Sequence, residues 1–268
     1  MIKKTCERIW ELIITNKNSV LIFLISFFIL TSFAGTRMYI DDEAVILDQF
    51  YNLIHGSISL ETFKINSNGI YLVLNDHIYG KFSYSLLILS LPVYYFLRAM
   101  DLLYGGHLFL LQLWALSGGF IAYLIAGTRK IKYPELFGVI SYFVLIAINM
   151  YYFKPINFPK WGEWLSIEFT NILITSLLVV FVYLLFRKFF SDKIAFFASL
   201  FLIFATPISF YAITLKHHTL SLFLTLLAFY FFSEAPHSRA VGHPLVPRFV
   251  VAFLGGCTQP QQSCGVFR

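Results

Sequence analysis

Residues Leu102–Thr128 read LLYGGHLFLLQLWALSGGFIAYLIAGT and contain no Asp, Glu, Lys or Arg. A helix of about 20 predominantly apolar residues is long enough to cross the hydrocarbon core of a bilayer. Apolar side chains occupy every face of this stretch, as in helices surrounded by lipid, whereas amphipathic helices of soluble proteins have a polar face. The stretch therefore predicts a transmembrane helix.

Similar charge-free stretches recur along the rest of the chain. They are Asn18–Thr36, the short Phe82–Leu97, Leu136–Phe153, Phe169–Phe186, Ile194–Leu215, the short Thr219–Ser233 and a stub at Phe249–Cys257. The sequence thus predicts an all-α polytopic transmembrane helix bundle of about 7–8 spans, with no charge deep in any span. A cleaved signal is an alternative for the first stretch, because Ser32-Phe33-Ala34 resembles a cleavage site.

The composition excludes several other classes of protein. Of 268 residues, 58% are hydrophobic and 13% are charged, with a mean hydropathy of +0.74. These values exclude a disordered chain and an ordinary cytosolic enzyme. The three scattered cysteines form neither a disulfide framework nor a metal-binding spacing. A net charge of +6 suits cytoplasmic loops that meet anionic lipid, and we expect no nucleic-acid partner.

Lysine and arginine positions predict the orientation in the membrane. Residues 1–18 are basic and are expected to be cytoplasmic, whereas the first outer loop, 38–82, holds six acidic and two basic residues. One conflict remains open. Two full spans between Phe82 and Thr128 would place the basic residue Arg129 outside. Either Phe82–Leu97 is re-entrant or interfacial, or the rule fails at one loop.

The first outer loop contains a helical pattern. Its apolar positions are Ile40, Ala44, Leu47, Tyr51 and Ile54, spaced by four, three, four and three residues. This spacing predicts an interfacial amphipathic helix lying on the membrane surface, with Asp48 and Gln49 away from the apolar face. Asp41, Asp42 and Glu43 lie at its start, where they can act as general base, bind a divalent cation such as Mg²⁺ or Mn²⁺, or simply cap the helix.

Two further polar clusters border predicted spans. Tyr79 and Lys81 precede the short Phe82–Leu97 stretch; Lys81 can neutralise a phosphate, or it can be a lysine that snorkels to the interface. Lys216, His217 and His218 end the sixth span, where they can hold a lipid phosphate or cap the helix. Pro207 is expected to kink that span, and Gly118-Gly119 indicates close helix packing in the third.

The last 35 residues, 234–268, differ in composition from the rest of the chain. They contain no lysine and three arginines, whereas residues 1–233 contain twelve lysines and five arginines. Two interpretations stay open. The tail is either a genuine cytoplasmic C-terminus or the product of a truncated or frameshifted gene whose true product continues with more helices.

Three stretches together resemble a known family. They are DDEAVILDQFY at Asp41–Tyr51 followed by IHGSI, HIYGKFSYSLLILSLPVYYFL at His77–Leu97, and FATPISFYAITLKHHTLSLFL at Phe204–Leu224. Their order resembles the polytopic type C (GT-C) glycosyltransferases, in particular the protein mannosyltransferase and aminoarabinose transferase group. The resemblance extends from about Val20 to Ser233, although the family commonly has Pro-Pro where this chain has Ser83 and Tyr84.

The resemblance implies a function for the module 19–233. Members of the family move a sugar from a polyprenyl-phosphate donor to a lipid, glycan or protein acceptor on the outer face of the cell membrane. By resemblance, a carboxylate among Asp41, Asp42 and Glu43 deprotonates the acceptor. The donor phosphate would lie near a set of polar side chains: Tyr79, Lys81, Lys216, His217 and His218. No cofactor is certain, and the metal requirement is unknown. The alternatives are a polytopic transporter or lipid flippase, or an inactive fragment of a larger transferase.

Overall fold

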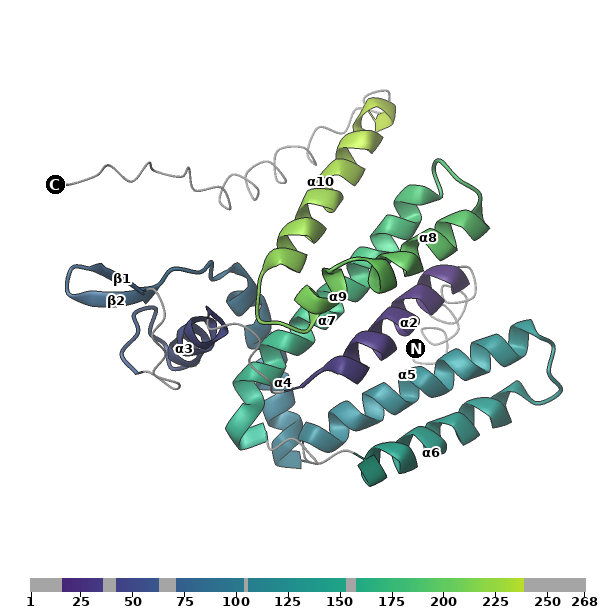
Figure 1. The fold of residues 1–268 in the computed structure, drawn as a ribbon, viewed down its shortest axis with the longest axis horizontal. Coiled ribbons are helices and arrows are strands. Elements are labelled where there is room, and N and C mark those ends of the chain that lie inside the picture. Colours follow the sequence, from purple (N-terminus) through teal and green to yellow (C-terminus); the bar gives the residue numbers. More distant parts are fainter. Residues whose placement is uncertain (1–15, 36–41, 63–70, 104–105, 153–157, 239–268) are drawn as a thin grey trace, which may run out of the picture.

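The computed structural model describes residues 16–35, 42–62, 71–103, 106–152 and 158–238, and within them the fold is predominantly helical (Figure 1). Its elements are α2 (Lys17–Phe33), α3 (Asp42–Ile54), β1 (Tyr71–Leu74), β2 (His77–Gly80), α4 (Ser85–Leu103), α5 (Gly106–Thr128), α6 (Pro134–Tyr152), α7 (Phe158–Phe186), α8 (Asp192–Ala205), α9 (Ile208–Ala212) and α10 (His218–Ser238). The expected α-helical class is confirmed, with one unpredicted hairpin.

Four of the described helices are long and apolar enough to cross a membrane, as expected of a membrane protein. They are Ser85–Leu103, Leu108–Thr128, Pro134–Tyr151 and Lys160–Phe186, with shorter apolar helices at Lys17–Ser32 and His218–Tyr230. The full number of 7–8 spans stays a prediction. The sixth predicted span, Ile194–Leu215, is wrong as a single helix, because the chain breaks at Thr206 and Pro207 between α8 and α9. Proline lacks the amide hydrogen that would continue the helix, and the expected kink is therefore a complete break.

The long helix α7 is the central element, and α2, α4, α8 and α10 all pack against it (Figure 1). It begins eleven residues before the predicted span and so includes Glu163 and Glu168, both buried. Both carboxyl groups therefore lie in the first third of the candidate span Lys160–Phe186, whereas the predicted span Phe169–Phe186 contains none. Trp164, in the same part of α7, is buried as well. These residues are buried because α3 and α4 pack over the first turns of α7.

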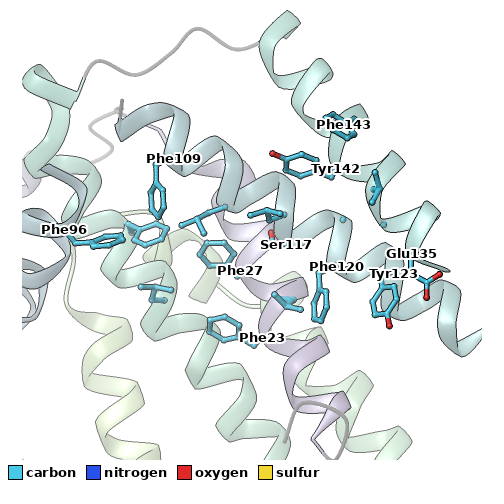
Figure 2. Close-up of a pocket in the computed structure, with 18 residues that line it drawn as sticks. Phe23, Phe27, Phe96, Phe109, Ser117, Phe120, Tyr123, Glu135, Tyr142 and Phe143 are labelled. Carbon is cyan, nitrogen blue, oxygen red and sulfur yellow. The ribbon is translucent and has the colours of Figure 1, made fainter. Parts of the chain in front are cut away.

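Helices α5 and α6 form an antiparallel pair held by close backbone contact. A Cβ atom on Gly119 would lie 2.8 Å from the carbonyl oxygen of Gly138, and one on Gly118 would overlap a Leu145 side-chain carbon. The close packing expected at Gly118-Gly119 is confirmed. Because α6 packs chiefly on α5, it leaves an apolar groove of about 1140 Å³ between itself and α2, into which Phe23, Phe27, Phe120 and Tyr142 project (Figure 2).

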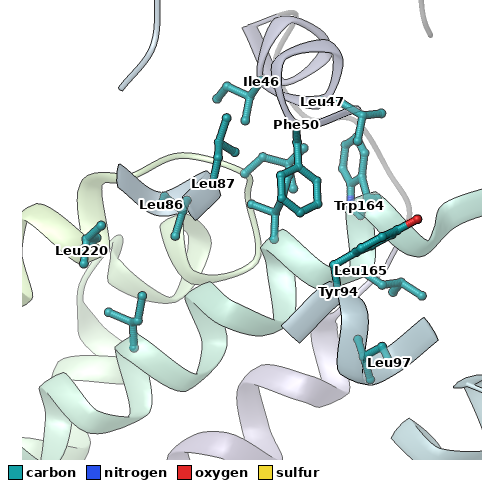
Figure 3. Close-up of a cluster of buried hydrophobic side chains, with 13 residues drawn as sticks. Ile46, Leu47, Phe50, Leu86, Leu87, Tyr94, Leu97, Trp164, Leu165 and Leu220 are labelled. Carbon is teal, nitrogen blue, oxygen red and sulfur yellow. The ribbon is translucent and has the colours of Figure 1, made fainter. Parts of the chain in front are cut away.

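Helix α4 packs against α7 and leads to the start of α5 (Figure 1). Because Ser85–Leu103 is of membrane-spanning length, both alternatives for 82–97 stay open. Side chains of α3, α4 and α7 meet in one buried cluster, in which Phe50 contacts Tyr94 edge to face and lies near Trp164 (Figure 3). Helix α3 is therefore covered by protein on several sides. Asp48 and Gln49, expected on its polar face, are fully buried, so an amphipathic helix with its polar face in water is the wrong description.

The hairpin of β1 and β2 was not expected from the sequence. Asn75 and Asp76 occupy its two-residue turn with positive φ angles of 51° and 62°, as in hairpin turns that favour Asn and Asp. Gly80 ends β2 directly against Gln49 of α3, where any side chain would overlap the glutamine. Gln49 Nε2 donates to the carbonyl oxygens of Gly80, at 3.3 Å, and Phe82, at 3.0 Å. These bonds fix the 80–82 segment on α3.

Some expectations fall on parts of the chain outside the described residues. These are Asp41, the three cysteines, most of the basic N-terminus and residues 239–268 of the atypical tail.

The α5–α6 contact predicts different effects for two glycines of the same helix. Gly119→Val should lower stability by about 1–3 kcal/mol, because the new side chain meets the backbone of α6. Gly127→Val is the matched control, since nothing lies within 4 Å of a Cβ there. Thermal unfolding of both variants in the same detergent measures the difference. Equal losses would contradict the importance of the close contact.

Candidate functional site

The centre of the candidate site is an ion pair between two of the predicted clusters. Lys216 Nζ donates to Asp42 Oδ2 at 2.7 Å, across 174 positions of sequence. The lysine side chain is 8% exposed and the aspartate side chain 37%. Asp42 begins α3, and Lys216 lies in the 213–217 connection between α9 and α10. The carboxylate thus lies on the solvent side of a nearly buried ammonium group.

Glu43 adds a second link between α3 and this connection. Its Oε1 atom accepts the backbone N–H of Leu215 at 3.1 Å, and the side chain is fully buried. Acidic residues in the first turn of a helix are ordinary capping groups, but both of these side chains point to a distant segment. Their contacts hold the 213–217 connection over the start of α3.

Asn171 of α7 holds the same connection from the other side. Its Nδ2 group donates to the carbonyl oxygens of Thr214, at 2.7 Å, and Lys216, at 2.8 Å, and its Oδ1 atom accepts the Thr219 hydroxyl at 2.8 Å. The residue is fully buried. One amide side chain therefore satisfies two carbonyl groups of an irregular segment, which would otherwise be buried without partners.

The second predicted cluster reaches the site through an aromatic ring. The ammonium groups of Lys216 and Lys81 lie 4.8 Å and 5.4 Å from the ring centroid of Phe82. Cations at these distances are attracted to the face of an aromatic ring. Because Gln49 fixes the Phe82 backbone on α3, the ring brings an exposed lysine and a buried lysine to one place.

The charges around the site alter two ionisation equilibria. The hydrogen bond from Lys216 lowers the pKa of Asp42 below its ordinary value, and the nearby Lys81 acts in the same direction. Burial lowers the pKa of His217, helped by the adjacent His218 and Lys216. At neutral pH, Asp42 is therefore ionised and His217 is neutral, so that His217 can either accept or donate a proton.

The remaining predicted residues lie further from the ion pair. Tyr79 pairs with Leu72 across the hairpin, and no described contact joins it to Asp42 or Lys216. His218 packs against Tyr211, with ring centroids 4.8 Å apart. These two rings line a cavity of about 500 Å³ at the break between α8 and α9, together with Thr206, Pro207 and Thr219. The cavity shares Thr219 with the Asn171 network.

Glu168 is a buried carboxylate near the site that sequence reasoning missed. It is 1% exposed, and its Oε1 atom accepts the backbone N–H of Gly35 at 3.0 Å. Its Oε2 atom is buried and has no hydrogen-bond partner in the described part of the chain. The residue lies one helical turn before Asn171 and so belongs to the same region of α7.

The described side chains do not form a divalent metal site by themselves. No group of three His, Cys, Asp or Glu residues within the described ranges could hold a metal ion. The Asp42 carboxylate already pairs with an ammonium group, and Glu43 Oε1 accepts a backbone hydrogen bond. The Mg²⁺ or Mn²⁺ expectation stays a prediction, and no step below depends on it.

Three residues that build the site were not predicted to do so: Gln49, Phe82 and Asn171. Asn171 had a detectable signal, since it is a strong hydrogen-bonding group inside the apolar run Phe169–Phe186. Gln49 had a weaker signal, as the polar neighbour of a buried stripe. The role of Phe82 depends on folding alone, because nothing in its local sequence distinguishes it from other interfacial aromatic residues.

No protein-family model, curated protein or solved structure matches this chain.

The Asn171 network predicts a large loss of stability when the amide is removed. Asn171→Leu should lower the unfolding free energy by on the order of 3 kcal/mol, because it leaves buried carbonyl groups unpaired. Thr175→Val is the control one turn along the same helix, where the hydroxyl donates only to its own helix backbone. Chemical unfolding in detergent measures both variants. Similar losses in the two would contradict the proposed role of Asn171.

The ion pair predicts a defined pH dependence of stability. The pKa of Asp42 is lower in the folded state, so the pair stabilises the protein above the unfolded-state pKa of about 3.9, and this contribution is lost as the pH falls through the folded value. We expect Asp42→Asn to melt below wild type at pH 7 and to match it in strong acid. Melting temperatures between pH 7 and about 2.5 test this, with Asp76→Asn as control. A constant difference across that range would contradict it.

Proposed function

We propose that this protein is a membrane glycosyltransferase that moves a sugar from a polyprenyl-phosphate carrier to an acceptor hydroxyl on the outer face of the membrane. The observation that carries the proposal is the Asp42–Lys216 ion pair, since it joins the first and third of the stretches that resemble GT-C enzymes. A carboxylate and two lysine ammonium groups beside one aromatic ring supply both polar functions that such a transfer requires.

The transfer needs a base on the acceptor side. The acceptor oxygen attacks the anomeric carbon of the sugar, and its proton passes to a carboxylate. Asp42 is the proposed base, because it is ionised and partly exposed beside the 213–217 connection. Glu43 is fully buried and bonded to Leu215, and we assign it to positioning that connection.

The leaving group needs positive charge. As the bond between the anomeric carbon and the phosphate oxygen breaks, its electron pair remains on the phosphate. Lys216 and Lys81 can stabilise that negative charge, and such preorganised charge is often the largest contribution to catalysis. Neutral His217 lies next to Lys216 and can donate a hydrogen bond to the same group.

Two cavities suit the other parts of a lipid-linked sugar. The groove between α2 and α6 is apolar, and half of its lining residues are aromatic, which suits a hydrocarbon chain (Figure 2). The smaller cavity beside His218 and Tyr211 combines ring faces with the hydroxyl groups of Thr206 and Thr219, a mixture that suits a sugar. The helices of membrane-spanning length are in keeping with a multi-pass protein whose substrate is a lipid.

A lipid transporter is the second candidate, and Glu168 is the observation that favours it. Ionisable residues within membrane spans often mark transport pathways. Glu168 is buried within the candidate span Lys160–Phe186 and has one carboxylate oxygen without a partner among the described residues. We rank this candidate second, because Glu168 lies near the start of that span and the ion pair suits transfer chemistry.

The transferase proposal predicts that Asp42→Asn lowers the rate of sugar transfer by about 10²–10⁴-fold, the usual contribution of a general base. The assay supplies purified protein in lipid vesicles with polyprenyl-phosphate hexoses and pentoses plus a membrane extract as acceptor. It then measures the release of polyprenyl phosphate.

Asp76→Asn, in the exposed hairpin turn, is the matched control and should retain full activity. Wild-type protein that transfers no sugar, or an Asp42→Asn variant as active as wild type, would contradict the proposal. Lipid movement across the vesicle that depends on Glu168 but not on Asp42 would favour the transporter.

A further inference from the structure

Lys216 has a structural feature that simple phosphate binding does not require. Its ammonium group is nearly buried, and the described contacts of that group are one carboxylate oxygen and the face of Phe82. An ammonium group has three hydrogen-bond donors. The Asp42 oxygen takes one of them from the side that faces solvent, because the aspartate is several times more exposed than the lysine. Asp42 therefore lies where an incoming anion would approach.

We propose that Asp42 is an internal competitor for the anion site of Lys216, and that the phosphate of the lipid donor displaces it from the lysine when the donor binds. This inference rests on the proposed function. It adds that phosphate binding to Lys216 and release of the Asp42 carboxylate occur in the same step, before the acceptor is deprotonated. Asp42 is then free to take the acceptor proton only when a donor is present.

The charges around Asp42 are consistent with such an exchange. Lys216 and Lys81 are the cations near Asp42, and both lie against Phe82. Glu43 on α3 and His217 in the connection are the remaining ionisable neighbours in the described part of the site, with Glu168 of α7 beyond Glu43. Both ammonium groups attract Asp42, but the described hydrogen bonds join Asp42 to Lys216 alone. Because Lys81 attracts the Asp42 carboxylate as well, the donor gains its advantage over Asp42 from the burial of its hydrocarbon chain.

The exchange also gives the ion pair a role before donor binding. A carboxylate that holds a hydrogen bond from an ammonium group is a weaker base than a free one. The Asp42–Lys216 pair therefore keeps the base inactive without a donor. It also supplies the counter-charge that a nearly buried lysine needs. The same pair prevents the carboxylate from activating water at an empty site.

The experiment is a double-mutant cycle on phosphate binding. Geranylgeranyl monophosphate in detergent micelles is titrated by calorimetry into wild type, Asp42→Asn, Lys216→Gln and the double variant. We expect Asp42→Asn to tighten binding about threefold to tenfold, up to 1.4 kcal/mol for a tenfold change. Lys216→Gln should weaken binding, and the Asp42→Asn effect should disappear in the Lys216→Gln background.

The cycle separates competition from simple repulsion. If Asp42 only repels phosphate, its removal tightens binding equally with and without Lys216, and that result would overturn the proposal. Weaker or unchanged binding in Asp42→Asn would overturn it as well. Asp76→Asn should bind like wild type. Lys216→Arg keeps the cation if the glutamine variant fails to fold, and in that background Asp42→Asn should still tighten binding.

Two further measurements separate this inference from the proposed function. Titration with inorganic phosphate distinguishes a lipid phosphate from free phosphate, because only the lipid gains affinity from its chain. If the double-mutant cycle shows the expected coupling but no sugar is transferred, the competition between Asp42 and phosphate is supported and the transferase proposal is contradicted. Sugar transfer without thermodynamic coupling between Asp42 and Lys216 would retain the transferase and contradict the competition.

Discussion

The position of the 213–217 connection depends chiefly on one amide side chain. Asn171 binds two carbonyl oxygens of the connection and the hydroxyl of Thr219. These bonds are buried, where an unpaired polar group is costly, so the connection has little freedom to move away from α7. The nearly buried ammonium of Lys216 lies where this backbone directs it, and the contacts of Asp42 and Glu43 follow from that position.

The site is thus assembled from three elements that are distant in sequence. Helix α3 supplies the carboxylates, the 80–82 segment supplies a lysine and an aromatic ring, and the connection after α9 supplies the second lysine. Gln49 and Asn171 attach two of these pieces to rigid helices. The break at Pro207 also contributes to the site, since an unbroken helix from α8 would carry the chain past it. Lys216, which lies on irregular backbone, is in this way held in place by a regular helix, α7.

Local patterns in the sequence predicted local structure well. The apolar runs predicted helices, Gly118-Gly119 predicted close packing, and Pro207 predicted a kink at the place where the helix breaks, because each effect depends on neighbouring residues or on one backbone property. The hairpin was missed, since its strands have only four residues each and are too short to give a clear alternating pattern. The burial of Asp48 and Gln49 was missed for another reason. The apolar stripe of α3 describes one face of the helix, whereas α4, α7 and β2 also cover its other faces.

For the site, the sequence predicted which residues take part, but it did not predict which of them contact one another. Asp42, Lys81 and Lys216 were each expected near a phosphate or a base, and they lie at one place. Their pairing across 174 positions could not be predicted, because no local spacing encodes a contact that depends on the packing of α3, α7 and α9. Glu168 was overlooked because α7 was expected to begin after it, and an error in a helix boundary therefore hid a buried carboxylate.

The packing of α6 has a consequence for how the protein would respond to its surroundings. Because α6 rests chiefly on α5 through Gly119 and Gly138, the width of the groove on its inner side would depend, in a bilayer, on the lateral pressure of the lipid chains as well as on protein contacts. A stiffer or thicker bilayer would press α6 toward α2, and a looser one would let it tilt away. The bilayer would therefore influence the width of the groove. Under the proposed function, the lengths and shapes of the hydrocarbon chains that the groove can bind would then depend on the stiffness and thickness of the bilayer.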